Sequence, residues 1–268
     1  MSVNDVINIH FAHANGFPAA SYQQVFNALP SHFNVMALTQ FGHNPAFPVN
    51  NNLSNLVDEL LDYLYKNVDF PVYGVGHSMG ALVTYMAACE APELFKGVIM
   101  LEPPIASGLA SWIFKLAKMT PLIERVSPAG KAATRCQSWP IDLDLIDYFS
   151  GKSLFKNFAP ACIADYVNAA TKVVGERRVL TFDAQVEAQI FRNVNDNIHR
   201  YYGKMQRPSF LISAENSPVC VPSNLSHFVK NTKIEHLRVP RLGHMFPLEA
   251  PVDVAQLIGQ KIRQWEEA

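Results

Sequence analysis

Residues 74 to 80 read Gly-Val-Gly-His-Ser-Met-Gly, and this segment constrains the fold more than any other in the chain. The stretch just before it is short and apolar, as is typical of a strand. The stretch after it, Ala81 to Cys89, is typical of a buried helix. A sharp turn from strand to helix brings neighbouring backbones so close that a Cβ beside the serine would clash, which requires glycine there. The pattern therefore predicts that Ser78 stands on a tight turn at a helix N-terminus, where free N–H groups favour negative charge.

Apolar stretches alternate with helical stretches along most of the 268 residues. Strands that are apolar along their length and separated by helices predict an α/β fold, with a mainly parallel sheet covered by helices on both faces. We expect about six strands, at 6–11, 33–38, 72–76, 97–101, 207–213 and 234–239.

The alternation stops between the fourth and fifth strands. From residue 104 to about 200 the sequence shows only helical signals, at 109–119, 142–149, 160–173 and 184–202. We therefore expect a core formed by 1–103 and 204–268, with a helical cap insertion, 104–203. Ligands of such sheets bind beyond the carboxyl ends of the strands, so the cap is expected to roof the site.

Composition excludes several classes of function. The formal net charge of −1 gives no electrostatic reason to expect nucleic acid or an anionic membrane surface as a partner. The first six residues carry no positive charge, and no long apolar run follows them, so we expect no signal peptide, no membrane span and a cytoplasmic protein. The four cysteines are widely spaced and are expected to be small buried hydrophobes in a reducing compartment. No HExxH or Cys/His spacing occurs, so no metal or other cofactor is expected.

A serine nucleophile needs a base, and His244 is the best placed of the nine histidines. It follows the last strand and precedes the last helix, so it should reach the same carboxyl edge of the sheet as Ser78. His77 is expected to pack within the turn, and the role of His43, which lies in a loop, stays open. Ordinary surface or core roles are expected for five others: His10, His32, His199, His227 and His236.

An oxyanion formed at Ser78 needs backbone donors. One should be the N–H of Met79, the residue after the nucleophile. The other should come from the loop after the first strand, where we assign the N–H of Phe17.

Four segments, in order, carry a family resemblance: the first strand, the His-Ala-Asn-Gly-Phe-Pro loop at 13–18, Gly-His-Ser-Met-Gly at 76–80 and Gly-His-Met-Phe-Pro-Leu-Glu at 243–249. The chain resembles the α/β-hydrolase superfamily, in particular its single-domain serine hydrolases with a helical cap. The resemblance spans nearly the whole chain and implies a nucleophile elbow, an oxyanion hole and a Ser-His-acid triad. Two features depart from the family: Asn15-Gly16 stands where His-Gly is usual, and the N-terminal antiparallel hairpin is expected to be reduced or missing.

The acid of the triad is the main departure. The resemblance implies an aspartate in the turn at 213–219, but the matching position holds Ser217. Glu102 directly follows the strand next to the nucleophile strand, where some family members, haloalkane dehalogenases among them, place their acid. An unpaired carboxylate between an apolar strand and two prolines would be costly, which favours Glu102. Glu215 remains the alternative acid.

The cap is rich in bulky apolar side chains, most of which are expected to form helix cores and cap-to-sheet packing. A stripe at helical spacing, Leu109, Trp112, Ile113 and Leu116, is more typical of a core than of a pocket. Some of the surplus is expected to line an apolar acyl or alcohol pocket.

Serine with histidine predicts a serine hydrolase that cleaves carboxylic esters of small, mainly apolar substrates through an acyl-enzyme. The expected partner is therefore a small apolar ester or acyl compound, and the protein is expected to be a monomer or homodimer. A thioesterase, a carbon–carbon bond hydrolase and a ligand-binding homologue without turnover stay open as alternatives.

Overall fold

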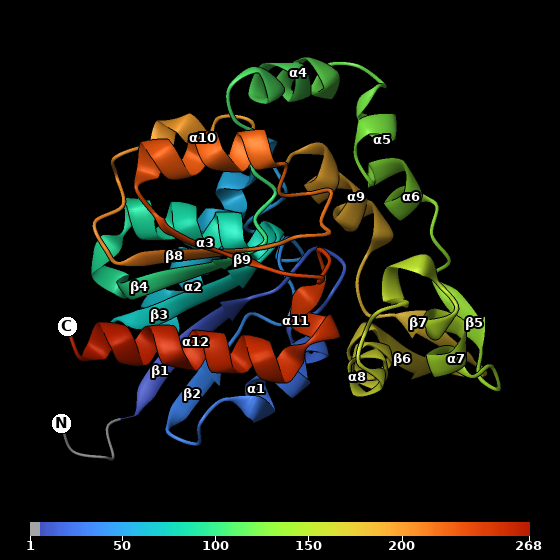
Figure 1. Cartoon of the computed structure of the whole chain (residues 1–268). Coiled ribbons are helices and arrows are strands. Elements are labelled where there is room, and N and C mark those ends of the chain that lie inside the picture. Colours follow the sequence, from blue (N-terminus) through green and yellow to red (C-terminus); the bar gives the residue numbers. More distant parts are fainter. Residues whose placement is uncertain (1–5) are drawn as a thin grey trace.

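The computed structural model describes residues 6–268 and places a six-stranded sheet at the centre of the molecule (Figure 1). The strand order is β2-β1-β3-β4-β8-β9, and within the described residues every pairing in this sheet is parallel. The strands are β1 (Ile7–Ala12), β2 (Phe33–Met36), β3 (Val72–His77), β4 (Phe95–Leu101), β8 (Ser209–Ala214) and β9 (Glu235–Val239). The expected fold class is confirmed. The expectation about a signal peptide concerns residues that lie mostly outside the described part.

Helices cover both faces of the sheet, as strands buried along their length require. One face carries α2 (Ser54–Asn67), α3 (Met79–Glu90) and α10 (Pro222–Thr232), whereas the other carries α1 (Gln23–Ala28) and α12 (Pro251–Glu266) (Figure 1). Each face encloses its own apolar cluster. On α2 the spacing of Leu56, Leu60 and Leu64 buries all three against the sheet.

The chain between β4 and β8 lies beyond the carboxyl ends of the strands (Figure 1). Its helices are α4 (Leu109–Lys118), α5 (Ile123–Val126), α6 (Ala129–Ala133), α7 (Leu145–Ser150), α8 (Pro160–Ala170) and α9 (Ala184–Arg192). The last helical turn before α12 is α11 (Phe246–Glu249). Short 3-10 segments are η1 (Ala19–Tyr22), η2 (Asn51–Leu53), η3 (Pro92–Leu94), η4 (Ser153–Phe155) and η5 (Ile198–Tyr201).

The expectation of only helices between residues 104 and 200 is wrong. A three-stranded antiparallel sheet forms there from β5 (Ser138–Pro140), β6 (Thr171–Val174) and β7 (Arg177–Leu180). The register pairs Val174 with Arg177, which leaves Gly175 and Glu176 as a two-residue turn, and Gly175 has a φ of 57°. A glycine that directly follows two β-branched residues, here Val173 and Val174, is the local signal for such a hairpin.

Two side-chain expectations also fail. The stripe formed by Leu109, Trp112, Ile113 and Leu116 is neither core nor pocket, because all four side chains are 58–75% exposed. Cys136 is exposed as well, whereas the other three cysteines are buried and all four are free thiols.

Candidate active site

Ser78 occupies the turn between β3 and α3 with a φ of 53° and a ψ of −120°, a conformation that residues other than glycine rarely adopt. The glycines around it are needed for close backbone approach. A Cβ on Gly76 would meet the backbone of Gly80, and one on Gly80 would meet the carbonyl of Ala12. The sequence pattern thus produces the strained turn because two flanking positions have no room for a side chain.

His244 and Ser78 meet at this edge of the sheet. His244 lies in the loop between β9 and α11, and its Nε2 is 3.0 Å from Oγ of Ser78. This is hydrogen-bond distance for a hydroxyl that donates to an unprotonated ring nitrogen. The structure therefore brings together the two residues that sequence reasoning paired.

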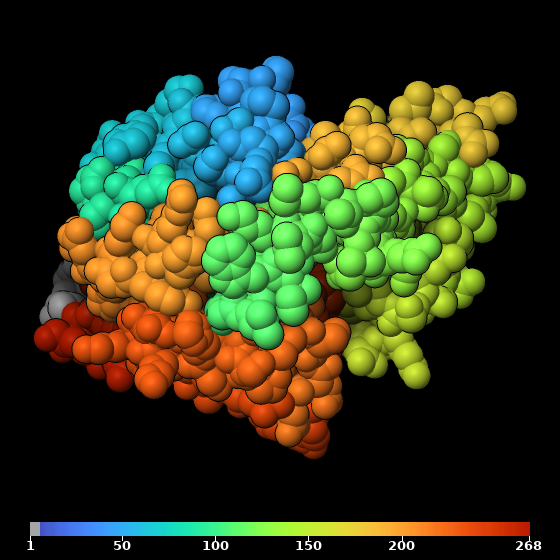
Figure 2. Space-filling view, turned by 90° about the horizontal axis from the view of Figure 1, so that it is seen from above, coloured from blue at the N-terminus to red at the C-terminus, as the bar shows by residue number. Residues whose placement is uncertain are grey.

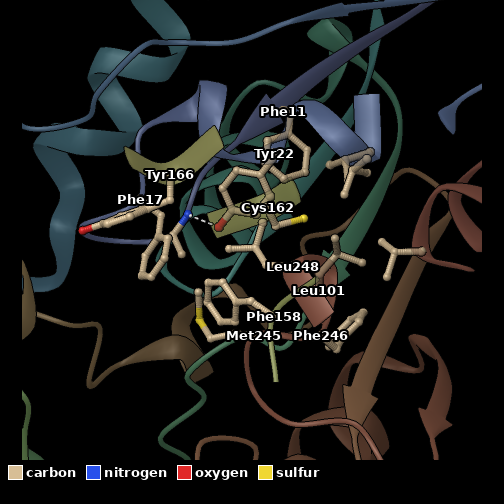
Figure 3. Close-up of a cluster of buried hydrophobic side chains, with 14 of the residues drawn as sticks. Phe11, Phe17, Tyr22, Leu101, Phe158, Cys162, Tyr166, Met245, Phe246 and Leu248 are labelled. Carbon is tan, nitrogen blue, oxygen red and sulfur yellow. Dashed lines mark hydrogen bonds between the residues drawn. The ribbon is translucent and has the colours of Figure 1, made fainter. Parts of the chain in front are cut away.

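The ring of His77 ties three parts of the site together. Its Nε2 lies 2.9 Å from the backbone oxygen of His244, and its Nδ1 lies 2.7 Å from the hydroxyl of Tyr22. That hydroxyl accepts a hydrogen bond from the N–H of Ala14 (Figure 3). It therefore donates to His77 Nδ1, and Nε2–H of His77 donates to the backbone oxygen of His244. Burial, with repulsion from His244 next, lowers the pKa of His77 to about 3, so the ring stays neutral. No signal in the sequence linked Tyr22 to the site.

The other ring nitrogen of His244, Nδ1, faces away from Ser78. Nδ1 of His244 is buried and has no hydrogen-bond partner among residues 6–268. Burial lowers the pKa of His244 to about 4. The ring is therefore neutral at neutral pH, and if Nε2 accepts the Ser78 proton, Nδ1 carries the hydrogen.

Glu102 is buried at the end of β4, with a φ of 50° and no exposed surface. Its Oε2 accepts a hydrogen bond from the N–H of Ala214 at 2.5 Å, and its Oε1 accepts one from the N–H of Cys220 at 3.2 Å. The Ser217 hydroxyl also contacts this carboxylate. Burial raises the pKa of Glu102, and these hydrogen bonds oppose the rise. The carboxylate thus sits against the turn that carries Ser217, without a hydrogen bond to His244.

Glu215 lies on the surface of the same turn. Its Oε2 accepts a hydrogen bond from the N–H of Arg241 at 2.9 Å. The structure does not bring Glu215 to the ring of His244, and its surface position fits a turn-stabilising side chain.

The backbone N–H groups of the two expected oxyanion donors, Met79 and Phe17, differ in whether they already have a hydrogen-bond acceptor. Met79 opens α3, where a first-turn N–H has no intrahelical acceptor. The N–H of Phe17 instead donates to the carbonyl of Ala14 at 3.1 Å and closes a turn. Both residues line the cavity that contains Ser78.

That cavity has a volume of about 530 Å³, and its wall is mostly apolar. Ser78 and His244 lie in the wall, and the segment between β4 and β8 supplies Phe114, Leu154 and Phe191. Beside it the ring of Phe17, in the loop after β1, lies 4.9 Å from that of Tyr166 on α8 (Figure 3). A neighbouring cavity of about 440 Å³ shares Phe17, Leu154 and Phe191 with it.

The remaining histidines lie elsewhere. His43 accepts a hydrogen bond from the N–H of Asp183 in a surface loop. His236 lies 2.8 Å from the hydroxyl of Ser213. His10 is fully buried, as a core role requires, and neither of its ring nitrogens has a hydrogen-bond partner among the described residues. Burial lowers the pKa of His10 to about 3.

A family model described as "Alpha/beta hydrolase family" matches residues 11–257. The chain belongs to this family. The match confirms the superfamily expected from the elbow and the loop motifs.

Solved structures with the same fold share little sequence with this member of the family. E-2-(acetamidomethylene)succinate hydrolase aligns with a TM-score of 0.78 at 17% identity, over 97% of this chain and 92% of that one. A peroxisomal alpha-beta-hydrolase from Saccharomyces cerevisiae aligns with a TM-score of 0.77 at 15% identity, over 97% and 77%. The thioesterase domain from the curacin biosynthetic pathway gives a TM-score of 0.70 at 16% identity, over 96% and 92%. At these identities the likeness shows the fold alone.

A curated relative matches over a shorter stretch. The monoglyceride lipase homolog of Monkeypox virus is 32% identical over 75 residues, which is 28% of this chain. The match spans about a quarter of that protein, 26% of its length.

Among residues 6–268, no helix has both the length and the apolar character needed to cross a bilayer.

Proposed function

We propose that this member of the alpha/beta hydrolase family is a serine hydrolase that cleaves carboxylic esters of small, mainly apolar substrates. The observation that carries the proposal is the 3.0 Å contact between Ser78 Oγ and His244 Nε2 in the wall of an apolar cavity. An apolar wall with few polar groups suits an acyl chain or an alcohol without charge.

The geometry supports acyl transfer in two stages. In the first, Ser78 Oγ attacks the ester carbonyl while its proton passes to Nε2 of His244, and the N–H of Met79 donates to the oxyanion. The intermediate then collapses, the alcohol leaves with the proton from Nε2, and an acyl-enzyme remains. In the second, a water molecule attacks the acyl-enzyme by the same route and frees the acid.

Glu102 is the proposed acid. Its carboxylate already accepts hydrogen bonds from the N–H of Ala214, the N–H of Cys220 and the hydroxyl of Ser217, and the Cys220 thiol also lies against it. A carboxylate has about four acceptor positions, so Nδ1–H of His244 would take the position that the weakly donating thiol faces when the ring becomes charged in the reaction. The second oxyanion donor is proposed to be Phe17, whose N–H would turn from Ala14 toward the substrate.

Hydrolysis of p-nitrophenyl butyrate tests the proposal. Ser78→Ala should lower kcat by about a thousandfold or more, since the nucleophile is lost. Ser226→Ala, an exposed serine on α10, is the matched control and should leave the rate unchanged. Equal rates for wild type and Ser78→Ala would overturn the proposal and favour a binding protein.

A thioesterase is the second candidate, because attack by Ser78 Oγ with proton transfer to His244 Nε2 would cleave a thioester by the same two stages. Matched oxygen and sulfur esters of butyrate separate the two. Ester specificity predicts the larger rate enhancement over the uncatalysed reaction for the oxygen ester, and the opposite order would favour the thioesterase.

A further inference from the structure

Helix α4 is apolar on two opposite faces. Its inner face, Ala110, Phe114 and Ala117, turns toward the protein: Ala110 and Phe114 line the cavity that contains Ser78, and Ala117 is buried. Its outer face faces solvent. An apolar stripe on a helix normally packs against the protein, so the exposed outer face lacks a partner among the described residues.

The outer face continues past the helix to form one exposed apolar surface. Seven large side chains, each 49–77% exposed, belong to it: Leu109, Trp112, Ile113, Leu116, Met119, Leu122 and Val126. We call them the outer apolar face. Soluble monomers rarely expose so many large apolar groups together, and such surfaces mark interaction sites. Figure 2 shows this green segment across the upper surface, beside a hollow in which red C-terminal residues are visible.

The charges around this face are nearly all positive. Between residues 104 and 134 the only acid is Glu124, and it is paired with Arg192 at 2.6 Å. Lys115 and Arg125 are exposed, and the ammonium of Lys115 lies 5.3 Å from the ring centre of Trp112. Lys118 is instead held by Asp196. The net charge of −1 for the whole chain conceals this local excess of cations.

We propose that the outer apolar face docks on a lipid surface with anionic headgroups, with Lys115 and Arg125 at the level of the headgroups. A helix with Trp and Leu on one side and Lys beside them is typical of one that lies in a membrane interface. A second copy of the chain fits less well, because two such faces would bring their cations together. The docked α4 would hold the cavity wall that contains Phe114 and Val126 against the lipid.

Sedimentation with vesicles tests the proposal without using turnover, so its failure is distinct from failure of the proposed hydrolysis. The full chain carrying Ser78→Ala is mixed with phosphatidylcholine vesicles, or with vesicles of phosphatidylcholine and phosphatidylglycerol, at about 0.1 M salt, where surface charges still act. We expect about tenfold stronger binding to the anionic vesicles, because two cations contribute.

Variants locate the docking surface. Trp112→Ser combined with Leu116→Ser should weaken vesicle binding about tenfold or more. Phe70 lies just before the amino end of β3, far from α4, and its side chain is 55% exposed. Phe70→Ser is therefore the control and should bind vesicles as the parent does. Lys115→Glu with Arg125→Glu should abolish the preference for anionic vesicles. Thermal unfolding of each variant shows that it is folded.

A second readout covers the case in which the double variant does not fold. Trp112 fluorescence, taken as the difference between the parent and Trp112→Phe, should shift to shorter wavelength with anionic vesicles. No binding to anionic vesicles, equal binding by the double variant and the parent, or no fluorescence shift would overturn the proposal. A lipid-free dimer that Leu116→Ser dissociates would also overturn it, by making this face a subunit interface.

Discussion

Nε2 of His244 lies 3.0 Å from Oγ of Ser78 although 166 positions separate the two residues. The contact exists because the parallel sheet brings the carboxyl ends of β3 and β9 to one edge. The His77 ring, bonded to Tyr22 and to the backbone of His244, holds the loop that carries His244. The catalytic proposal therefore depends on the sheet and on one buried hydrogen-bond chain, and the following predictions test each part.

The proposed acid gives the first prediction. Glu102→Gln should lower kcat by about a hundredfold or more, because a neutral amide cannot stabilise the His244 imidazolium. Glu215→Gln is the matched control. Its kcat should stay near that of wild type, because the Glu215 side chain lies on the surface and accepts a hydrogen bond from the N–H of Arg241. Steady-state kinetics with an aryl ester measure both, and the reverse ranking would refute the assignment.

The pH profile of kcat/KM gives the second prediction. This quantity reports the free enzyme, in which His244 must be neutral to accept a proton. Burial lowers the pKa of His244 to about 4, so activity is present above that pH and is lost as pH falls through it. We expect a flat profile from about pH 5.5 to 8, well above the His244 limb. An acidic limb near the ordinary histidine pKa would show that a carboxylate already holds the ring in the free enzyme.

The Tyr22 hydroxyl gives the third prediction. Tyr22→Phe leaves the Ala14 N–H and His77 Nδ1 buried without partners, which should lower the free energy of unfolding by about 2 kcal/mol. It should also lower kcat about tenfold, because the loop of His244 loses support. Denaturant unfolding and ester kinetics measure the two effects. Tyr65→Phe, an exposed tyrosine bonded to Glu93, should change neither, and equal effects in both variants would contradict a positioning role.

The glycines of the elbow give the fourth prediction. Gly80→Ala places a methyl group against the backbone of Ala12 and His13, which cannot move cheaply. We expect a loss of about 2 kcal/mol or more in the free energy of unfolding. Gly151→Ala is the control, since its φ is −71° and the nearest atom to a new Cβ is 3.7 Å away. Similar unfolding midpoints for the two variants would show that the turn does not need glycine at residue 80.

Local chemistry explains which parts of the fold the sequence could predict. The strand, the glycines and the following helix around Ser78 are neighbours in the chain, so the turn at Ser78 could be predicted from local sequence alone. His244 could be placed because parallel topology fixes where the loop after the last strand lies. The β6–β7 hairpin was missed because apolar helix α8 runs into it without a break, and only Gly175 marks the turn.

The contacts and the exposure of individual side chains could not be predicted from the sequence. Burial of Glu102 was foreseen from its neighbours, but its hydrogen bonds to the Ala214 and Cys220 backbone depend on how two loops meet. The exposure of Trp112 and Leu116 was not foreseen either, because periodicity shows that a helix has an apolar face without showing what covers it.

Treatment with a fluorophosphonate, followed by intact-protein mass spectrometry, shows whether Ser78 is an activated nucleophile. We expect one phosphonyl adduct on wild type, located at Ser78 by peptide mapping, because His244 activates that hydroxyl. Ser78→Ala should stay unmodified, and His244→Ala should react far more slowly. An unmodified wild type, or an adduct at another residue that persists in Ser78→Ala, would contradict the account.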